Sequence, residues 1–251
     1  LDKEQPFYAL QPSELDNYRS FENQLLSFPS IKDVAARCIE ALQTLQPQDP
    51  YLLGGWSLGG CIAFEMAQQL QKQGHRVLLL ALLDVIIQDL NEVDDSALVY
   101  WFASYLGSRR NKELPLHCEE LKKLDFKEQL NYVLKQAIIA EVLSPNTDLS
   151  QIHYLFQIYK TGVQTSLRQA QNYEMQSYPN HITLFHASEW LDGVVHESKH
   201  DWRDWDKFSN QLPEVHIVPG NHYTMFIEPY VQILADKLKN CLNRVQLDEI
   251  Q

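Results

Sequence analysis

The sequence predicts an α/β protein, with a mostly parallel sheet flanked by helices and a helical block inserted into it. Strand-like runs alternate with helical patterns in the first third of the chain, and the run 77–83 (VLLLALL) is apolar throughout. A fully apolar run is typical of a central parallel strand that is covered on both faces. From residue 96 to about 178 the apolar residues follow helical spacing almost without interruption. At 251 residues, we expect one domain over 1–251.

The chain opens with alternating strands and helices. We predict a short strand over 6–11 and a helix over 31–46, whose apolar residues recur on one face. A second strand over 51–55 precedes a helix over 61–73, which a glycine ends. The apolar strand VLLLALL follows directly, so the predicted order is strand, helix, strand, helix, strand.

A block of helices then interrupts the sheet, at about 88–178. Its predicted helices cover 96–106, 126–142 and 149–175, the last bent near Gly162. The sheet resumes with predicted strands over 181–187 and 214–218, and a helix over 229–242 closes the chain.

Charge and cysteine content exclude several classes of function. A formal net charge of −12 leaves no broad basic surface, which argues against a nucleic-acid partner. Four separate cysteines without a CxxC pair favour reduced thiols and a cytoplasmic location. No apolar run approaches the roughly 18 residues that cross a bilayer, so we expect no membrane association.

The stretch GGWSLGG, residues 54–60, contains the first motif that suggests a catalytic function. It contains G-x-S-x-G, with Ser57 between a predicted strand and a predicted helix. A sharp strand-to-helix turn strains the backbone, so we expect that Gly55 and Gly59 must lack side chains. Such a turn lifts a serine clear of the sheet, where the hydroxyl can act as a nucleophile if a base activates it.

An acid and a base follow at positions that suit this serine. Asp84 is the first polar residue after VLLLALL, and His222 lies in the loop after the last predicted strand. The carboxyl ends of parallel strands meet at one edge of a sheet, where ligands and catalytic groups gather. Alone, such an aspartate is more often a helix cap and such a histidine ordinary surface. The chain order Ser, Asp, His is that of α/β-hydrolases.

Two longer stretches carry a more specific resemblance. YLLGGWSLGGCIAFEMAQQLQKQGHRVLLLALLD (51–84) and EVHIVPGNHYTMF (214–226) resemble the thioesterase domains that end nonribosomal peptide synthetases and polyketide synthases. The resemblance implies an α/β-hydrolase fold with the helical block as a lid. It also implies that the residue matching Ser57 is acylated by a chain delivered on the phosphopantetheine of an acyl or peptidyl carrier protein, upstream in the same or a partner megasynthase. Water or a nucleophile within the acyl chain then releases this small molecule, by hydrolysis or macrocyclisation, with no cofactor bound to the domain.

The expected mechanism assigns each residue a role. His222 takes the Ser57 proton during attack on the thioester, and Asp84 orients and stabilises the imidazole. The backbone N–H of Leu58 donates to the oxyanion. The resemblance implies a second donor from a strand and loop upstream of residue 1, so we expect the chain to lack that segment.

Aromatic and basic residues suggest contacts with the substrate or the carrier. Trp56 beside the serine, and Tyr132 and Tyr159 in the helical block, are candidate substrate-binding residues, although packing explains Trp56 equally well and is the more usual role of the two tyrosines. Lys122, Lys123 and Lys127 form a small basic group that suits an acidic carrier protein or a solvated helix face.

Other functions stay open at this point. A free-standing editing thioesterase or an esterase for small esters would use the same residues. A binding module would keep the fold without the chemistry. The stretch 196–200 (HESKH) spells H-E-x-x-H, the pattern of zinc metallohydrolases, but no apolar helical stripe surrounds it, so we expect no metal there.

Overall fold

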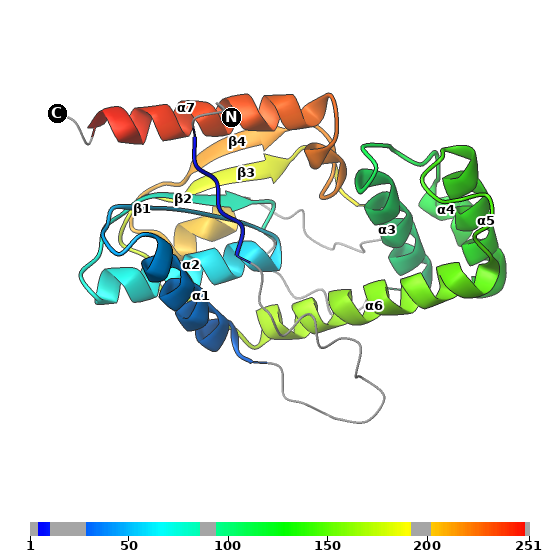
Figure 1. Cartoon of the computed structure of the whole chain (residues 1–251), viewed down its shortest axis with the longest axis horizontal. Helices are drawn as coiled ribbons and strands as arrows, with labels where there is room; N and C mark the ends of the chain where they lie inside the picture. Colours follow the sequence, from blue (N-terminus) through cyan, green and yellow to red (C-terminus); the bar gives the residue numbers. More distant parts are fainter. Residues whose placement is uncertain (1–4, 11–28, 86–93, 192–201, 249–251) are drawn as a thin grey trace.

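A computed structural model describes residues 5–10, 29–85, 94–191 and 202–248 of the chain. Its centre is a parallel sheet whose strands follow one another in chain order, β1-β2-β3-β4. The strands are β1 (Tyr51–Trp56), β2 (Val77–Leu83), β3 (Thr183–Ala187) and β4 (Glu214–Val218). All four point their carboxyl ends toward the same side of the molecule (Figure 1). This confirms the predicted α/β class.

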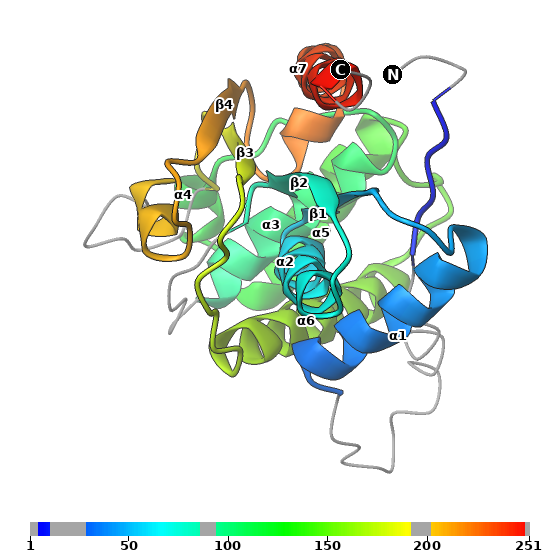
Figure 2. The same cartoon turned by 90° about the vertical axis from the view of Figure 1, so that its left-hand side faces the viewer.

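Helices cover both faces of the sheet. Helices α1 (Ile31–Leu45) and α2 (Leu58–Lys72) lie on one face, and α7 (Tyr230–Asp248) lies on the other (Figures 1 and 2). Leu80 and Leu82 of β2 join the core under α1 and α2, whereas Leu79 and Ala81 join the core under α7. Successive residues of a strand point to opposite faces. Burial on both faces therefore explains why β2 is apolar throughout.

The block between β2 and β3 is helical, as predicted. We call it the helical insertion; it comprises α3 (Asp95–Ser108), α4 (Cys118–Leu121), α5 (Phe126–Ile139) and α6 (Leu149–Gln171). Its side chains form a core of their own, in which Phe102 and Phe156 are fully buried. Helix α3 faces the carboxyl ends of the strands, and α6 runs back toward α1 and α2 (Figure 1).

Aspartate caps fix where the helices of the insertion begin. Asp94, Asp125 and Asp148 each accept a hydrogen bond from the backbone N–H three residues later, at the starts of α3, α5 and α6. Such caps satisfy N–H groups that a helix leaves without partners. Helix α5 ends at Ile139 and not at the predicted residue 142, because the chain turns through Glu141 at φ 57°.

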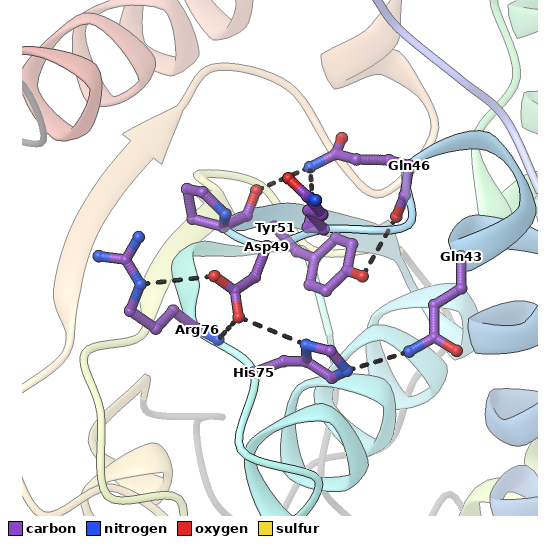
Figure 3. Close-up of polar contacts among 8 residues, drawn as sticks. Gln43, Gln46, Asp49, Tyr51, His75 and Arg76 are labelled. Atoms are coloured by element: carbon purple, nitrogen blue, oxygen red, sulfur yellow. Dashed lines mark hydrogen bonds and ion pairs between the residues drawn. The ribbon is translucent and has the colours of Figure 1, made fainter.

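A polar network holds the amino ends of β1 and β2 together, far from Ser57 along both strands (Figure 3). The Asp49 carboxylate accepts the backbone N–H of Arg76 at 3.2 Å and contacts His75 Nδ1 at 3.3 Å. The Tyr51 hydroxyl donates to the Gln46 carbonyl at 3.2 Å. These bonds tie the turn before β1 to the start of β2, which supports the alignment of their opposite ends.

Other predictions of secondary structure are also wrong, and the closing helix, predicted over 229–242, runs on to Asp248 as α7. Residues 6–10 of the predicted strand 6–11 form no strand, and Phe7 and Tyr8 are exposed; residue 11 lies outside the described residues. An apolar run becomes a strand only where a partner strand pairs with it. Helix α6 continues through Gly162 and ends at Gln171, before the predicted residue 175.

Among the described helices, none combines the length and apolar character that crossing a bilayer requires.

Candidate active site

Ser57 occupies the sharp turn between β1 and α2. Its backbone has φ 54° and ψ −126°, a conformation that side-chain-bearing residues rarely adopt. The Ser57 N–H donates to the Leu83 carbonyl at 3.0 Å, and the Ser57 carbonyl accepts the Gly60 N–H at 2.9 Å. The turn is thus held from both sides. The Ser57 hydroxyl makes no capping hydrogen bond to α2, so capping the helix is not its role.

The glycines around Ser57 are not equivalent. A Cβ on Gly55 would lie 2.1 Å from the Gly59 carbonyl oxygen, so this position must be glycine, as expected. The same expectation for Gly59 is wrong, because a Cβ there would meet nothing within 4 Å. Gly60, which the motif does not single out, is the second tight position, at 2.1 Å from Val85 Cγ2. Close approach of α2 to β1 and to Val85 sets these requirements.

This difference supplies a matched pair of variants. Gly55→Ala should destabilise the protein by at least ~1–3 kcal/mol, because the added methyl group overlaps backbone atoms that cannot move aside. Gly59→Ala should be neutral or stabilise by up to ~1 kcal/mol, because alanine suits a helix better than glycine. Urea unfolding followed by tryptophan fluorescence measures both. Equal stabilities for the two variants would refute this description of the turn.

Asp84 lies beside Ser57 at the same edge of the sheet. Trp56 and Leu83 are paired residues of β1 and β2, so Ser57 and Asp84 follow equivalent positions on neighbouring strands. Asp84 has φ 46°, and its N–H donates to the Phe185 carbonyl at 2.7 Å. The backbone thereby directs the carboxylate toward the loops after β3 and β4.

The Asp84 carboxylate contacts His222. Its Oδ2 lies 2.7 Å from His222 Nδ1, and its Oδ1 accepts the Ala187 N–H at 3.0 Å. Burial of Asp84 would by itself raise its pKa, but its interactions with His186, His222 and the Ala187 N–H outweigh burial and lower the pKa below the ordinary value. An ionised carboxylate only accepts hydrogen bonds, so His222 Nδ1 is the donor in this contact, and no hydrogen bond joins Nε2 to any of the described residues.

The loop that carries His222 is held by its own side chains. The Asn221 amide oxygen accepts the N–H groups of Tyr223 and Thr224, each at 3.0 Å. The Trp56 ring packs on the His222 ring, with centroids 4.8 Å apart. Among the described residues, the hydrogen bond of His222 runs to Asp84, and none joins the imidazole to the Ser57 hydroxyl. Catalytic hydrogen bonds often tighten only when substrate is bound.

His186 is a neighbour of this site that the sequence reasoning missed. It lies on β3, and its Nδ1 is 3.4 Å from Asp84 Oδ1. Asp84 therefore faces two histidines, one at each oxygen. Its place near the carboxyl end of a predicted strand could have identified His186 from the sequence, because the same criterion identifies Asp84.

The three aromatic candidates lie in different places. Trp56 is 37% exposed and also packs against Tyr223, with centroids 5.8 Å apart. Tyr159 reaches the same loop from α6, because its hydroxyl lies 2.6 Å from the Tyr223 hydroxyl. Burial above all raises the pKa of Tyr223, to about 12, and also raises that of Tyr159, so both phenols stay neutral. Tyr132 lies on α5, where its hydroxyl contacts Glu120 at 3.4 Å, within the helical insertion.

The remaining candidates are a lysine of the insertion, the H-E-x-x-H stretch and the backbone N–H of Leu58. Lys122 is paired with Glu119 at 2.7 Å in the insertion. The stretch 196–200, with its H-E-x-x-H pattern, lies outside the described residues. The Leu58 N–H is the first of α2, and such N–H groups have no acceptor inside their helix. Within the described residues, one group of metal-ligand side chains lies together, formed by Glu214, His216 and Cys241.

The chain is similar to a known family of domains and to parts of several synthetases. The family model "Thioesterase domain" matches residues 9–241. The chain is 28% identical over 228 residues to the protein named Inactive atromentin synthetase invA3 from Paxillus involutus, covering 90% of this chain and 23% of that protein. It is 26% identical to the Atromentin synthetase of Tapinella panuoides, covering 90% of this chain and 23% of that protein. It is also 26% identical to Chondramide synthase cmdD of Chondromyces crocatus, covering 99% of this chain and 6% of that protein. The chain thus spans less than a quarter of the length of these relatives.

Solved structures agree on the fold. A four-domain nonribosomal peptide synthetase, holo-AB3403 bound to AMP and glycine, matches 87% of this chain over 16% of its own length, with a TM-score of 0.61 and 26% identity. The NocB thioesterase domain from the nocardicin cluster matches 93% of this chain over 80% of its own length, with a TM-score of 0.55 and 20% identity. The fold is therefore that of the α/β-hydrolase thioesterase domains.

Proposed function

The chain belongs to the thioesterase domain family, and from this premise we propose that it releases an acyl chain from a carrier-protein phosphopantetheine thioester through an acyl-Ser57 intermediate. One observation carries the proposal: the 2.7 Å contact between Asp84 Oδ2 and His222 Nδ1, at the sheet edge where Ser57 forms its strained turn. A base with one nitrogen held by a carboxylate and the other free is the partner that a serine nucleophile needs.

In the proposed acylation, His222 Nε2 takes the proton of the Ser57 hydroxyl as the oxygen attacks the thioester carbonyl. Asp84 stays ionised and stabilises the imidazolium that forms. The Leu58 N–H donates to the developing oxyanion at the start of α2, where the helix dipole adds to its effect. The protonated imidazole then gives its proton to the departing phosphopantetheine thiol.

Release of the acyl group repeats these steps with a new nucleophile. Water, or a hydroxyl or amine of the acyl chain, loses a proton to His222 Nε2 and attacks the Ser57 ester. The bond between the acyl carbon and Ser57 Oγ breaks, and His222 returns its proton to Oγ. The ring of Trp56 packs on His222, and the Tyr159 hydroxyl from α6 reaches the neighbouring Tyr223. Helix α6 thus contacts the loop that carries His222. We propose that the helical insertion shapes the space around the acyl group and so determines whether water or a nucleophile of the acyl chain attacks the Ser57 ester.

Turnover of a synthetic acyl-pantetheine thioester tests the function. We expect release of free thiol, and mass spectrometry of the products identifies either the acid or a cyclised chain. A matched oxoester, with oxygen in place of the thioester sulfur, serves as the control for a small-ester esterase and should react more slowly. If the protein releases no thiol and forms no acyl-enzyme, the binding module is favoured; the word "inactive" in the names of three relatives makes this outcome worth testing.

Asp84→Asn should lower kcat/KM for the same thioester by roughly 10⁴ while leaving weak activity. The asparagine keeps the size of the side chain but no longer holds the imidazole in the tautomer with a free Nε2. Asp84 also accepts the Ala187 N–H, so circular dichroism must show that the variant folds. Activity within tenfold of wild type would show that Asp84 does not orient the base.

A further inference from the structure

A second cluster of reactive side chains lies apart from Ser57, at the amino end of β4. Glu214 and His216 stand two residues apart on β4, and Cys241 comes from α7, which packs along that strand (Figures 1 and 2). His216 Nε2 is 3.3 Å from Cys241 Sγ and 3.1 Å from Glu214 Oε1. The three ligand atoms all lie within 4.8 Å of one another.

The geometry of this cluster differs from that of a catalytic relay. In a nucleophile–histidine–acid relay, the nucleophile and the acid contact different nitrogens of the imidazole. Here Cys241 Sγ and Glu214 Oε1 approach the same nitrogen, Nε2 of His216. Sulfur, nitrogen and oxygen therefore lie on one side of the imidazole, within 4.8 Å of one another, close enough to share a metal ion.

We propose that Cys241, His216 and Glu214 bind a zinc ion that joins α7 to β4. Thiolate, imidazole and carboxylate are the ligands that Zn²⁺ takes in proteins, with bonds of ~2.0–2.3 Å. Tetrahedral bonds of these lengths separate neighbouring donors by roughly 3.5 Å. The present separations of 3.3 Å between Cys241 Sγ and His216 Nε2 and 3.1 Å between Glu214 Oε1 and His216 Nε2 are close to that value, and water would complete the fourth position. On binding, the Cys241 S–H bond breaks, a Zn–S bond forms, and the proton passes to the buffer.

The groups around the cluster are compatible with an ion. Arg244 donates to both carboxylate oxygens of Glu214, and His181 Nε2 lies 3.5 Å from its Oε2. Each carboxylate oxygen has two lone pairs, so Oε1 can accept from Arg244 and still coordinate a metal. Hydrogen bonds of this kind orient ligating carboxylates in metal sites.

The proposed ion would stabilise the fold and would be independent of thioester chemistry. Cys241 is almost fully buried in the core under α7. Glu214 begins β4, whereas His222 follows the end of that strand, so the two sites lie at opposite ends of it. Zinc binding and acyl transfer can therefore be measured separately, and the failure of one proposal leaves the other standing.

Calorimetric titration with ZnCl₂ tests the site. The full chain is stripped with a chelator and kept reduced with a phosphine. His196 and His200 are both replaced by alanine, so that the H-E-x-x-H stretch contributes no metal ligands. We expect one Zn²⁺ per chain and a higher unfolding temperature with zinc. Cys241→Ser and His216→Gln should each weaken binding at least tenfold. Cys38→Ser, at another buried thiol, and Ser57→Ala should leave binding unchanged.

Cobalt supplies an independent readout of the thiolate. With Co²⁺ in place of zinc, we expect a near-ultraviolet thiolate-to-cobalt absorption band that Cys241→Ser removes. Circular dichroism and urea unfolding check that every variant is folded. The proposal is overturned if the stripped protein binds no stoichiometric zinc, if both ligand variants bind as tightly as their parent, or if the cobalt complex lacks the thiolate band.

Discussion

Ser57→Ala should lower kcat for an acyl-pantetheine thioester by about 10⁴–10⁶, because no other group replaces the nucleophile. Alanine differs from serine by one oxygen atom, and the Ser57 hydroxyl makes no capping bond to α2. The turn is held by the backbone bonds to Leu83 and Gly60, which the substitution preserves. Thiol release measured with a chromogenic thiol reagent gives the rate.

The control for this variant is its stability. We expect the urea midpoint of Ser57→Ala to match wild type within about 0.5 kcal/mol, since no described side-chain bond is lost. Loss of activity with unchanged stability assigns the loss to chemistry. A variant that retains a tenth or more of the wild-type kcat would exclude the acyl-serine route.

His222→Ala should reduce the rate of Ser57 acylation by a similar factor of about 10⁴–10⁶, because the serine loses its only proposed base. The measurement is single-turnover acylation with excess enzyme, followed by intact-protein mass spectrometry. Removing the imidazole also leaves Asp84 buried without its 2.7 Å partner, so some loss of stability accompanies the loss of rate.

His186→Ala is the matched control for His222, since both histidines contact the Asp84 carboxylate. Both variants disturb Asp84, but only His222→Ala removes the proposed base. We expect His186→Ala to slow acylation by no more than about tenfold. If His186→Ala proves the more damaging of the two, His186 and not His222 is the base.

The sequence predicts most of the sheet because a buried strand needs apolar residues at consecutive or alternating positions, and this pattern is visible in the sequence. The range 77–83 of β2 and the range 214–218 of β4 match the structure, and the fully apolar β2 indeed faces a core on each side. Element order alone places Asp84 and His222 at one sheet edge, where the structure brings them into contact. The strand over 6–11 fails for the opposite reason, because an apolar run does not reveal whether a partner strand exists.

Contacts between distant parts of the chain are what the sequence could not predict. The contact of His186 with Asp84, and the hydrogen bond of Tyr159 with Tyr223, depend on how β3 and α6 pack against other elements. The approach of Cys241 to His216 likewise follows from α7 lying along β4. The error at Gly59 has the same origin, since the motif gives the spacing of glycines but not the side on which α2 approaches β1.

The central claim is that His222 activates Ser57 for attack, and one measurement addresses it most directly. Wild type and His222→Ala are labelled with a fluorophosphonate that carries an acyl-chain mimic, and peptide mass spectrometry locates and quantifies the adduct over time. The account predicts stoichiometric labelling of the peptide that contains Ser57 in wild type, and labelling at least 10³-fold slower in His222→Ala. An adduct on another residue, or equal labelling rates for the two proteins, would contradict it.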